Sequence, residues 1–316
     1  MRKTVSNNSS IKCYSVPLPS VWQVLRWIHF DLSESDFAAL LADIKPRLAA
    51  NPELMPLEIV DGGARIAAAY FLRLCGNVAT LGGLRARREY EPQAGLVMQE
   101  FQHRLNNAGI AQIQALIDLN NLSSRLVMLN SSFRQATTVR HLWFNLLDIN
   151  YIAETSIAGY TCQPASRFAR REIDSLVEAT FVGTLDCPDL DGLRSPSDVV
   201  SGFLESKAWD ASLPWWVLCA EDKPIGCALV NSHPQAIFEL AYVGLDPAWR
   251  GRGLGRALVN FATNSCRRLG GSCLTTAVDT KNWPACMIYD SLGFSEIREL
   301  AVWLPKVTKS HQIVAA

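Results

Sequence analysis

The stretch IFELAYVGLDPAWRGRGLGR, residues 237–256, decides how this chain is interpreted. Its first nine residues predict a buried strand, because one residue in two is apolar and large: Phe238, Leu240 and Tyr242. Asp246-Pro247 predicts a turn, and glycines interleaved with arginines follow it. From Gly255 to about Leu269, apolar side chains recur at helical spacing. The stretch therefore predicts a strand, a glycine-rich loop and a helix in direct succession.

Such a junction is suited to bind an anion. Glycines allow backbone N–H groups to approach a ligand without obstruction by Cβ, and a helix N-terminus attracts negative charge. Arg250, Arg252 and Arg256 add positive charge, so a pyrophosphate fits the site. The loop has no Gly-Lys-Ser/Thr of a Walker motif, and GRGLGR lacks the last glycine of a dinucleotide fingerprint.

Two motifs resemble those of the GNAT acyltransferase superfamily. Residues 250–255, RGRGLG, are similar to motif A of that family, Arg/Gln-x-x-Gly-x-Gly/Ala after a strand. Residues 278–294, VDTKNWPACMIYDSLGF, are similar to the family motif that follows, with its Asn, its helical Tyr and its closing Leu-Gly-Phe. The resemblance implies a GNAT fold with acetyl-CoA as co-substrate and no metal.

The resemblance also assigns residues to acetyl-CoA. Val243 N–H would donate to the thioester oxygen and Leu245 N–H to the pantetheine arm, with Gly244 at a bulge that leaves both groups available. Asn282 would bond the pantetheine arm, or would instead cap the helix that follows it. The cradle for the pyrophosphate comprises Arg250, Gly251, Arg252, Gly253, Leu254, Gly255 and Arg256.

Two residues are candidates for catalysis. Acyl transfer to an amine needs an acceptor for the ammonium proton and a proton donor for the leaving thiolate. By resemblance, Glu239 is the candidate base, and burial on an apolar strand would raise its pKa; the alternative is a Glu that faces solvent. Tyr289 is the candidate acid, or else an aromatic residue of the core.

The loop GTLDCPDLDGLR, residues 183–194, holds the candidates for acceptor binding. In a GNAT fold, the helix-loop-helix segment at this place overhangs the acceptor site. Asp186, Cys187 and Arg194 are therefore predicted to bind substrate, although ordinary turn chemistry explains the same residue types. A nucleophilic role for Cys187 is less expected, because no histidine stands near it in the sequence.

A related pattern occurs earlier in the chain. Residues 118–133 and 279–294 form frames of equal length, in which Asn121 matches Asn282. The predicted fold class is therefore α/β, with two GNAT-type folds in tandem, each a mostly antiparallel sheet flanked by helices.

The two copies are expected to differ in function. Residues 1–150 form the first copy, and its loop contains Pro92 and no Gly-x-Gly, so few N–H donors are available for a phosphate. Residues 165–308 form the copy that carries both motifs. The first copy is predicted to lack acetyl-CoA and the second to be the catalytic domain.

Composition argues against several classes of partner. Lys plus Arg and Asp plus Glu both number 30, so neither nucleic acid nor an anionic membrane is an expected partner. No apolar run approaches the roughly 20 residues of a membrane helix. Nine scattered cysteines without CxxC predict reduced thiols in the cytoplasm and no zinc site. Residues 1–16 are expected to be a loose leader, and residues 21–41 a strand and then a helix capped by Ser33 or Ser35.

These observations favour one function over two alternatives. The leading hypothesis is an acetyl-CoA-dependent N-acetyltransferase, in which a primary amine of a small molecule or peptide attacks the thioester directly. One alternative is a non-catalytic acyl-CoA-binding sensor or scaffold, and the other is a transferase for a longer acyl group. The presence of Glu239, Asn282 and Tyr289 favours catalysis over the sensor.

Overall fold

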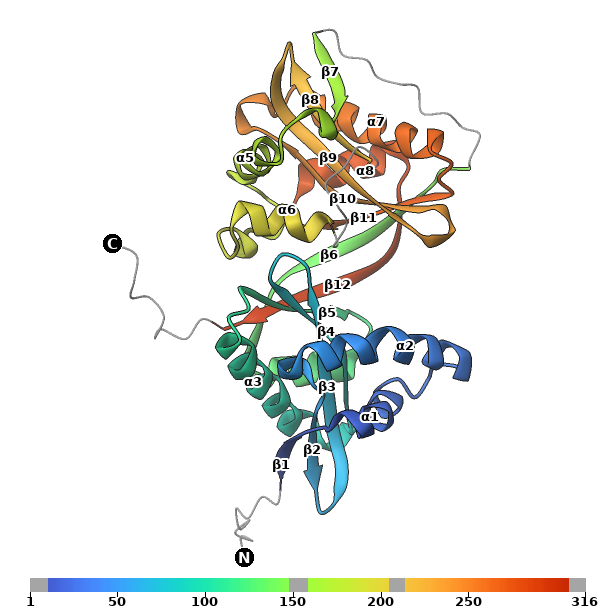
Figure 1. Cartoon of the computed structure of the whole chain (residues 1–316), viewed down its shortest axis with the longest axis vertical. Coiled ribbons are helices and arrows are strands. Elements are labelled where there is room, and N and C mark those ends of the chain that lie inside the picture. Colours follow the sequence, from blue (N-terminus) through green and yellow to red (C-terminus); the bar gives the residue numbers. More distant parts are fainter. Residues whose placement is uncertain (1–10, 148–158, 205–213, 307–316) are drawn as a thin grey trace, which may run out of the picture. The chain divides into compact units, whose positions relative to one another are not determined.

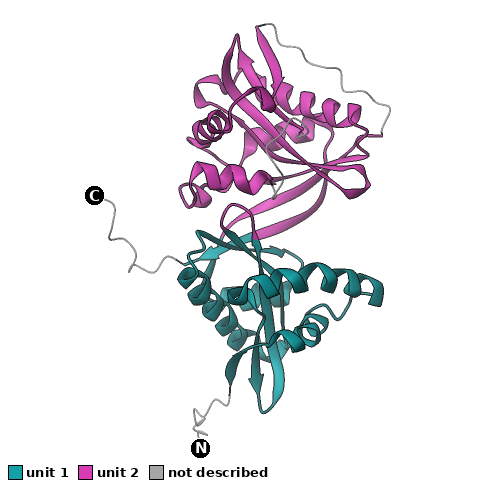
Figure 2. Cartoon of the chain, in the orientation of Figure 1, with its two compact units in different colours: residues 1–73, 78–135, 302–316 teal, residues 74–77, 136–301 magenta. Residues whose placement is uncertain are grey.

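A computed structural model describes residues 11–147, 159–204 and 214–306. By their contacts these residues form two compact units (Figure 2). Unit 1 takes the described parts of Met1–Arg73, Val78–Gln135 and Val302–Ala316, and unit 2 takes Leu74–Asn77 and the described parts of Ala136–Ala301. Both units combine a β-sheet with helices (Figure 1).

One order of elements occurs twice along the chain. The first half runs through β1 (Lys12–Ser15), α1 (Val21–Ile28), α2 (Glu34–Ala50), β2 (Leu57–Asp61), β3 (Ala64–Leu74), β4 (Val78–Ala86), α3 (Glu91–Asn107), β5 (Gln112–Asp118), α4 (Leu122–Leu129) and β6 (Phe133–Asn145). The second half runs through β7 (Tyr160–Pro164), α5 (Arg170–Phe181), α6 (Pro196–Leu204), β8 (Trp215–Ala220), β9 (Lys223–His233), β10 (Ile237–Leu245), α7 (Leu254–Arg268), β11 (Cys273–Asp279), α8 (Trp283–Leu292) and β12 (Ser295–Pro305). The predicted fold class, a mostly antiparallel sheet flanked by helices, is confirmed.

Each half contains a parallel strand pair that separates after a few residues. The strand order is β1-β2-β3-β4-β5 in unit 1 and β6-β11-β10-β9-β8-β7 in unit 2. Strand β4 pairs in parallel with β5 only as far as Thr80, and β10 pairs in parallel with β11 only as far as Leu240. Because β4 continues to Ala86 and β10 to Leu245, both pairs diverge towards their carboxyl ends.

Two strands cross the division between the halves of the sequence. Residues 136–145 of β6 belong to unit 2, where β6 pairs antiparallel with β11. Residues 302–305 of β12 belong to unit 1. The assignment of residues 1–150 and 165–308 to separate domains stays a prediction, and residues 148–158 of the expected boundary lie outside the described part of the chain.

The repeated frame has the same local structure in both copies. Asn121 and Asn282 are the N-cap residues of α4 and α8, with φ of −82° and −81°. Their side-chain oxygens accept the N–H of Ser124 at 3.0 Å and of Ala285 at 3.3 Å. Such a cap satisfies a donor that the helix itself cannot, which explains why Asn begins both helices.

The sheet of unit 2 buries apolar side chains on both of its faces. One core cluster joins Leu240 of β10 with the apolar stripe of α7, including Leu258 and Ala262, and burial of a Leu side chain stabilises by about 1.5–3 kcal/mol. A second cluster joins α5 and α6 with Trp215 and Leu229. The two clusters hold β10 in place from both sides, and β10 in turn positions the site.

Two local expectations were wrong. Val21–Ile28 is the helix α1, not a strand, because Val21, Val24, Leu25 and Ile28 are buried at helical spacing. The expected loose leader contains the strand β1, which pairs with β2. The predicted cap is confirmed: Ser33 Oγ accepts Asp36 N–H at 3.1 Å at the start of α2.

Candidate active site

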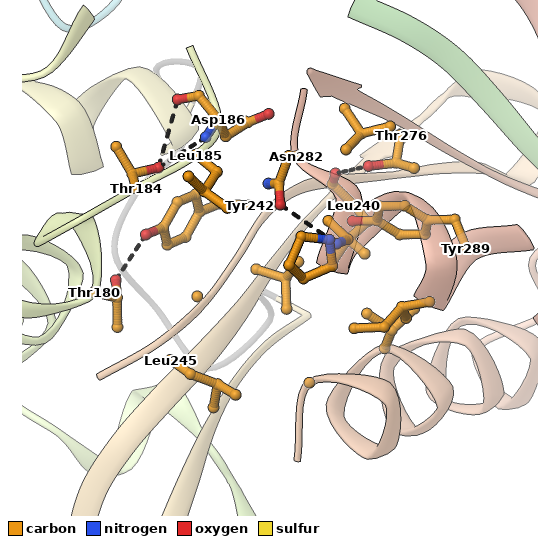
Figure 3. A pocket seen from close by; sticks show the side chains of 18 of the residues that line it. Thr180, Thr184, Leu185, Asp186, Leu240, Tyr242, Leu245, Thr276, Asn282 and Tyr289 are labelled. Carbon is orange, nitrogen blue, oxygen red and sulfur yellow. Dashed lines mark hydrogen bonds between the residues drawn. The ribbon is translucent and has the colours of Figure 1, made fainter. Parts of the chain in front are cut away.

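A cavity of about 230 Å³ opens in unit 2 where β10 and β11 diverge (Figure 3). Strands β10 and β11, the first turns of α7 and α8, and the loop after α5 form its wall. The polar side chains that line it include Thr180, Asp186, Tyr242, Asn282 and Tyr289. The sheet thus opens beside the glycine-rich loop that the sequence singled out.

The backbone of β10 presents donors to this opening. Asp246 N–H donates to Ile225 O of β9 at 2.9 Å. N–H groups alternate in direction along an antiparallel strand, so those of Val243 and Leu245 point away from β9. They face the side on which β11 has separated, which is where the acetyl-CoA hypothesis requires them.

The predicted bulge at Gly244 is wrong. The register of β10 on β9 shifts between Leu240 and Tyr242, and Gly244 pairs regularly with Cys227. A Cβ at Gly244 would lie 2.6 Å from Tyr242 Oη and 2.7 Å from Thr180 Oγ1. Glycine is therefore required at position 244 because a side chain has no space there, and not because the backbone needs a conformation that only glycine adopts.

Those two oxygens form a polar pair at the wall of the cavity. The Thr180 hydroxyl donates to Val177 O at 2.7 Å, so it can accept the hydrogen of the Tyr242 hydroxyl, which lies 2.7 Å away. The Tyr242 ring stacks between Phe181 and Phe203, with ring centroids 5.2 Å away in both cases. Burial raises the pKa of Tyr242, so its hydroxyl keeps its proton.

The glycine-rich loop has the backbone of an anion site. Gly251 and Gly253 have φ of +74° and +77°, a conformation that other residues rarely adopt. Gly253 is the N-cap of α7, whose first N–H groups have no partner within the helix. Gly255 lies in the first turn, where a Cβ would approach Ile288 Cδ1 to 3.1 Å. The loop thus directs several donors and the positive end of α7 towards one point.

Arg250 clamps the loop after α5 to the end of β10. Its guanidinium donates to Leu245 O at 3.0 Å, to Gly183 O at 3.1 Å and to Thr180 O at 2.8 Å. This arginine lines the cavity, but its donors are engaged with backbone carbonyls. Its positive charge remains close to the loop.

Arg252 and Arg256 are exposed at the start of α7. Arg252 lies over the Trp249 ring, 4.9 Å from the centroid, and donates to a backbone carbonyl. Arg256 donates to Ser291 Oγ. Both side chains therefore place a solvated positive charge near the helix N-terminus, as the pyrophosphate hypothesis requires.

Tyr289 and Asn282 bring α8 to the cavity. Tyr289 is 3% exposed, packs edge-on against Phe294 and lines the cavity. Burial raises the pKa of its hydroxyl, and a hydrogen bond with Thr276 opposes part of that rise. Asn282 lines the same cavity while its oxygen caps α8. Tyr289 thus has the core role and Asn282 the cap role that the sequence offered as alternatives, while their roles toward acetyl-CoA stay predictions.

Asp186 is held at the cavity by a reciprocal pair of hydrogen bonds. Asp279 N–H donates to Asp186 Oδ1 at 2.8 Å, and Cys187 N–H donates to Asp279 Oδ2 at 3.0 Å. Asp279 is fully buried, and its Oδ1 accepts the hydroxyl hydrogen of Thr137 at 2.8 Å. Asp186 keeps exposed surface, yet burial by the surrounding protein raises its pKa; the hydrogen bond from Asp279 N–H opposes part of that rise, and the nearby Asp279 side chain adds to it.

The other two predicted acceptor residues lie away from the wall of the cavity. Cys187 has a left-handed φ of +45°, and burial raises the pKa of its thiol well above the neutral range, which argues against a thiolate nucleophile. Arg194 donates to Gly76 O at 3.4 Å, and burial lowers its pKa. The left-handed backbone of Cys187 fits the turn alternative weighed from the sequence, whereas Arg194 contacts a distant segment, and acceptor binding by either residue stays a prediction.

Glu239 lies on β10 immediately before the part of the strand that lines the cavity. Its side chain is 40% exposed, so the expected burial is wrong. The reason is strand alternation: Phe238 and Leu240 enter the core, and Glu239 faces the opposite side of the sheet. Its Oε2 lies 3.0 Å from His233 Nε2.

Sequence reasoning missed Thr180, Tyr242 and Asp279. Thr180 and Asp279 meet their partners through contacts over long sequence separations, which local patterns do not reveal. One signal was present, because Asp118 and Asp279 begin the two equal frames. In both, the Asp Oδ1 accepts the N–H two residues later at 2.8 Å, at Asn120 and at Lys281.

The described residues contain neither a candidate metal site nor a candidate membrane span. No group of three or more His, Cys, Asp or Glu side chains within 11–147, 159–204 and 214–306 is arranged to hold a metal ion. In those same ranges, every helix is too short or too polar to span a bilayer.

Comparison with protein families supports the identity of this region. Residues 185–294 match the model of the Acetyltransferase (GNAT) family. Mycothiol acetyltransferase of Thermomonospora curvata is 39% identical over 71 residues, which are 22% of this chain and 24% of that protein. Mycothiol acetyltransferase of Corynebacterium glutamicum (strain R) is 37% identical over 71 residues, again 22% and 24%. The chain thus matches only about a quarter of the length of these relatives.

Solved structures share the fold over nearly the whole chain. A GCN5-related N-acetyltransferase from Sphaerobacter thermophilus aligns with a TM-score of 0.63 at 16% identity, over 96% of this chain and 98% of that one. A tandem GNAT protein from the clavulanic acid biosynthesis pathway aligns with a TM-score of 0.55 at 14% identity, over 95% and 100%. At these identities the likeness concerns the fold alone.

Proposed function

We propose that unit 2 is an acetyl-CoA-dependent N-acetyltransferase that transfers the acetyl group directly to a primary amine. The observation that carries this proposal is the opening between β10 and β11, with the N–H groups of Val243 and Leu245 facing it and the start of α7 beside it. The family match of residues 185–294 supports the same reaction class. The acceptor is proposed to be a small molecule or a peptide.

The residues present fit acetyl-CoA. Gly251 and Gly253 direct backbone donors towards a pyrophosphate, and Arg252 and Arg256 add positive charge. When bound, acetyl-CoA supplies the acyl thioester. Asn282 and the open side of β10 lie along the route that the pantetheine arm would take between the strands.

The chain's own residues can then perform three tasks. Val243 N–H can donate to the carbonyl oxygen of the thioester and stabilise the negative charge that develops there. Tyr289, whose hydroxyl carries a proton at neutral pH as an ordinary tyrosine does, can protonate the leaving sulfur. Glu239 is the proposed acceptor of the ammonium proton, at the end of the cavity where the strands begin to separate.

We propose further that the catalytic unit acts alone in binding acetyl-CoA. In the first half, the corresponding helix α3 begins with Glu91, which is 8% exposed, followed by Pro92. A buried carboxylate and a missing donor at that helix start oppose a phosphate. The alternative of a non-catalytic sensor has less support, because a sensor does not need a protonated Tyr289 at the cavity.

Titration calorimetry with acetyl-CoA on the full chain tests this proposal. We expect one binding site per chain, followed by release of free CoA when a primary amine is added. Two equivalent sites would contradict the assignment to unit 2. Binding without turnover of any amine would favour the sensor.

A further inference from the structure

A row of side chains crosses the sheet of unit 2 at the mouth of the cavity. Glu239 of β10 lies opposite Asn231 of β9 and opposite Thr275 of β11. Thr275 lies opposite Trp143 of β6. Residues directly opposite each other on neighbouring strands share a face of the sheet, so these four side chains form one row on one face.

The row is adjacent to the proposed site of acyl transfer. The next residues on β10 and β11, Leu240 and Thr276, form the last parallel pair before the strands diverge, and both line the cavity. Leu229, two residues before Asn231, belongs to the core cluster beneath α5 and α6. The row therefore lies on the same side of the sheet as those helices, next to the end of the cavity.

Asn231 is the unusual member of this row. It is 2% exposed, and no hydrogen-bond partner for its side-chain oxygen is present among the described residues. A buried acceptor without a donor costs stability, and such groups in native proteins call for an explanation. A ligand that brings a hydrogen-bond donor to the Asn231 side-chain oxygen supplies that explanation.

The electrostatics of the row select a cation. Glu239 brings a carboxylate that is 40% exposed, with His233 3.0 Å away. His141, two residues from Trp143 on the same face, has its pKa lowered, by burial first and by nearby Arg298 second. The His141 ring is therefore neutral near pH 7 and does not repel a cation.

Trp143 extends the row by two strands. Neighbouring strands are about 4.8 Å apart, so the indole stands roughly 10 Å from Glu239 across the sheet. Trp143 is 39% exposed and thus offers part of its ring to a ligand. One ammonium group cannot reach both ends, but an amine on a carbon frame can.

We propose that this row binds the acceptor of the transfer reaction, and that the acceptor is a primary ammonium carried on a frame that reaches Trp143. The inference rests on the proposed N-acetyltransferase function and names its substrate class. The ammonium lies between Glu239 and the Asn231 oxygen, and the frame crosses Thr275. Glu239 takes one proton from the ammonium, which leaves a neutral amine, a protonated Glu239 and a lone pair for attack on the thioester carbon.

Steady-state kinetics on the full chain with three probes test this inference: n-propylamine, tyramine and n-propanol, each with acetyl-CoA. In Asn231→Leu the KM for both amines should rise about 10- to 100-fold, because a hydrogen bond to a charged group is lost. In Trp143→Ala the KM should rise for tyramine and stay constant for n-propylamine. Trp22→Ala, at a tryptophan of unit 1 that is 49% exposed against 39% for Trp143, is the control and should change neither KM.

The outcomes separate this inference from the function on which it rests. Acetyl-CoA affinity, measured in parallel, should equal that of the wild type in all variants. Unchanged amine KM values in both variants, or turnover of n-propanol as fast as n-propylamine, would each overturn the acceptor site. A wild type that does not bind acetyl-CoA, or that binds it and turns over neither amine, would overturn the proposed function instead. If Asn231→Leu loses acetyl-CoA binding through misfolding, the half-exposed Trp143→Ala decides alone.

Discussion

The divergent strand pairs of the two units differ in what lies against β4 and β10, the strands that continue past the last parallel pair. In unit 1, the Tyr70 ring packs against β4 beyond the last parallel pair, where a Cβ at Gly82 or Gly83 would clash with it. The Tyr70 hydroxyl lies 2.9 Å from His29 Nε2. In unit 2 the corresponding stretch of β10 borders a cavity.

The helices that follow these strands, α3 and α7, also differ in the residues at their N-termini. Both helix starts have exposed arginines nearby, Arg87 and Arg88 before α3 and Arg252 and Arg256 at α7, but α3 begins with the buried carboxylate of Glu91 and α7 begins after Gly253. The comparison supports the proposal that unit 1 binds no acetyl-CoA although it keeps the same order of elements, because a few side chains differ at the strand pair and at the helix start. It also indicates which substitutions should separate the two units experimentally.

The largest effect is expected at the anion site itself. Gly253→Asp should abolish acetyl-CoA binding, because a carboxylate at the N-cap of α7 repels a pyrophosphate and mimics the situation at Glu91. Gly270→Asp is the control: its φ of +82° imposes a similar backbone strain, but at the other end of α7. Calorimetry measures both. If both variants lose acetyl-CoA affinity equally, backbone strain and not charge at the cradle governs binding.

The next effect concerns the two buried tyrosines. Tyr289→Phe should leave acetyl-CoA affinity unchanged and lower kcat by about 10² to 10⁴-fold, the usual contribution of general acid catalysis. Tyr70→Phe removes a hydroxyl that is buried to a similar degree in unit 1 and should leave kcat as it is. Single-turnover kinetics with tyramine compare them. Wild-type turnover in Tyr289→Phe would assign the proton donor to another group.

A smaller effect is expected from the charge of Asp186, whose side chain accepts the N–H of Asp279 at the end of β11 in unit 2. Because its pKa is raised in the folded state, its contribution to stability is present below the ordinary value of 3.8 and is lost as pH rises through the folded pKa. Asp186→Asn removes the charge and can still accept Asp279 N–H. The melting temperature of the variant should therefore increase relative to the wild type between pH 4 and pH 7. A melting-temperature difference between Asp186→Asn and the wild type that does not change with pH would contradict the raised pKa of Asp186.

The smallest effect should distinguish the two equivalent caps. Asn121→Ala and Asn282→Ala each remove one N-cap bond and should each destabilise the chain by about 1 kcal/mol. Only Asn282→Ala should also weaken acetyl-CoA binding, because Asn282 lines the cavity. Denaturant titration gives the first quantity and calorimetry the second. A loss of affinity in Asn121→Ala would mean that unit 1 takes part in binding.

The fold could be predicted from sequence where the signal is local. The glycine-rich loop, the helix of α7 and the repeated Asn cap each depend on a few neighbouring residues. The strand expected in α1 was wrong because its β-branched and aromatic residues favour a strand, while the buried set Val21, Val24, Leu25 and Ile28 has helical spacing. The pairing of β6 with β11 was beyond reach, because apolar alternation defines a strand but not its neighbour.

The site could be predicted less completely, for the same reason. Asn282, Tyr289 and the backbone of β10 were found because motifs mark them. The pairs Thr180–Tyr242 and Asp186–Asp279 join segments that are 62 and 93 residues apart, and no local pattern announces them. The exposure of Glu239 was an avoidable error, since the alternation that buries Phe238 and Leu240 places Glu239 on the other face.

The division of β6 and β12 between the units constrains how the protein can be made. Unit 1 includes residues 302–305, so its last strand segment is synthesised only after all of unit 2. A domain that emerges first from the ribosome usually folds first, but here the first unit stays incomplete until β12 has been synthesised. Two genes that each encoded one copy would therefore encode neither unit in full: unit 1 would lack the end of β12, and unit 2 would lack β6, the strand that carries Thr137 and Trp143.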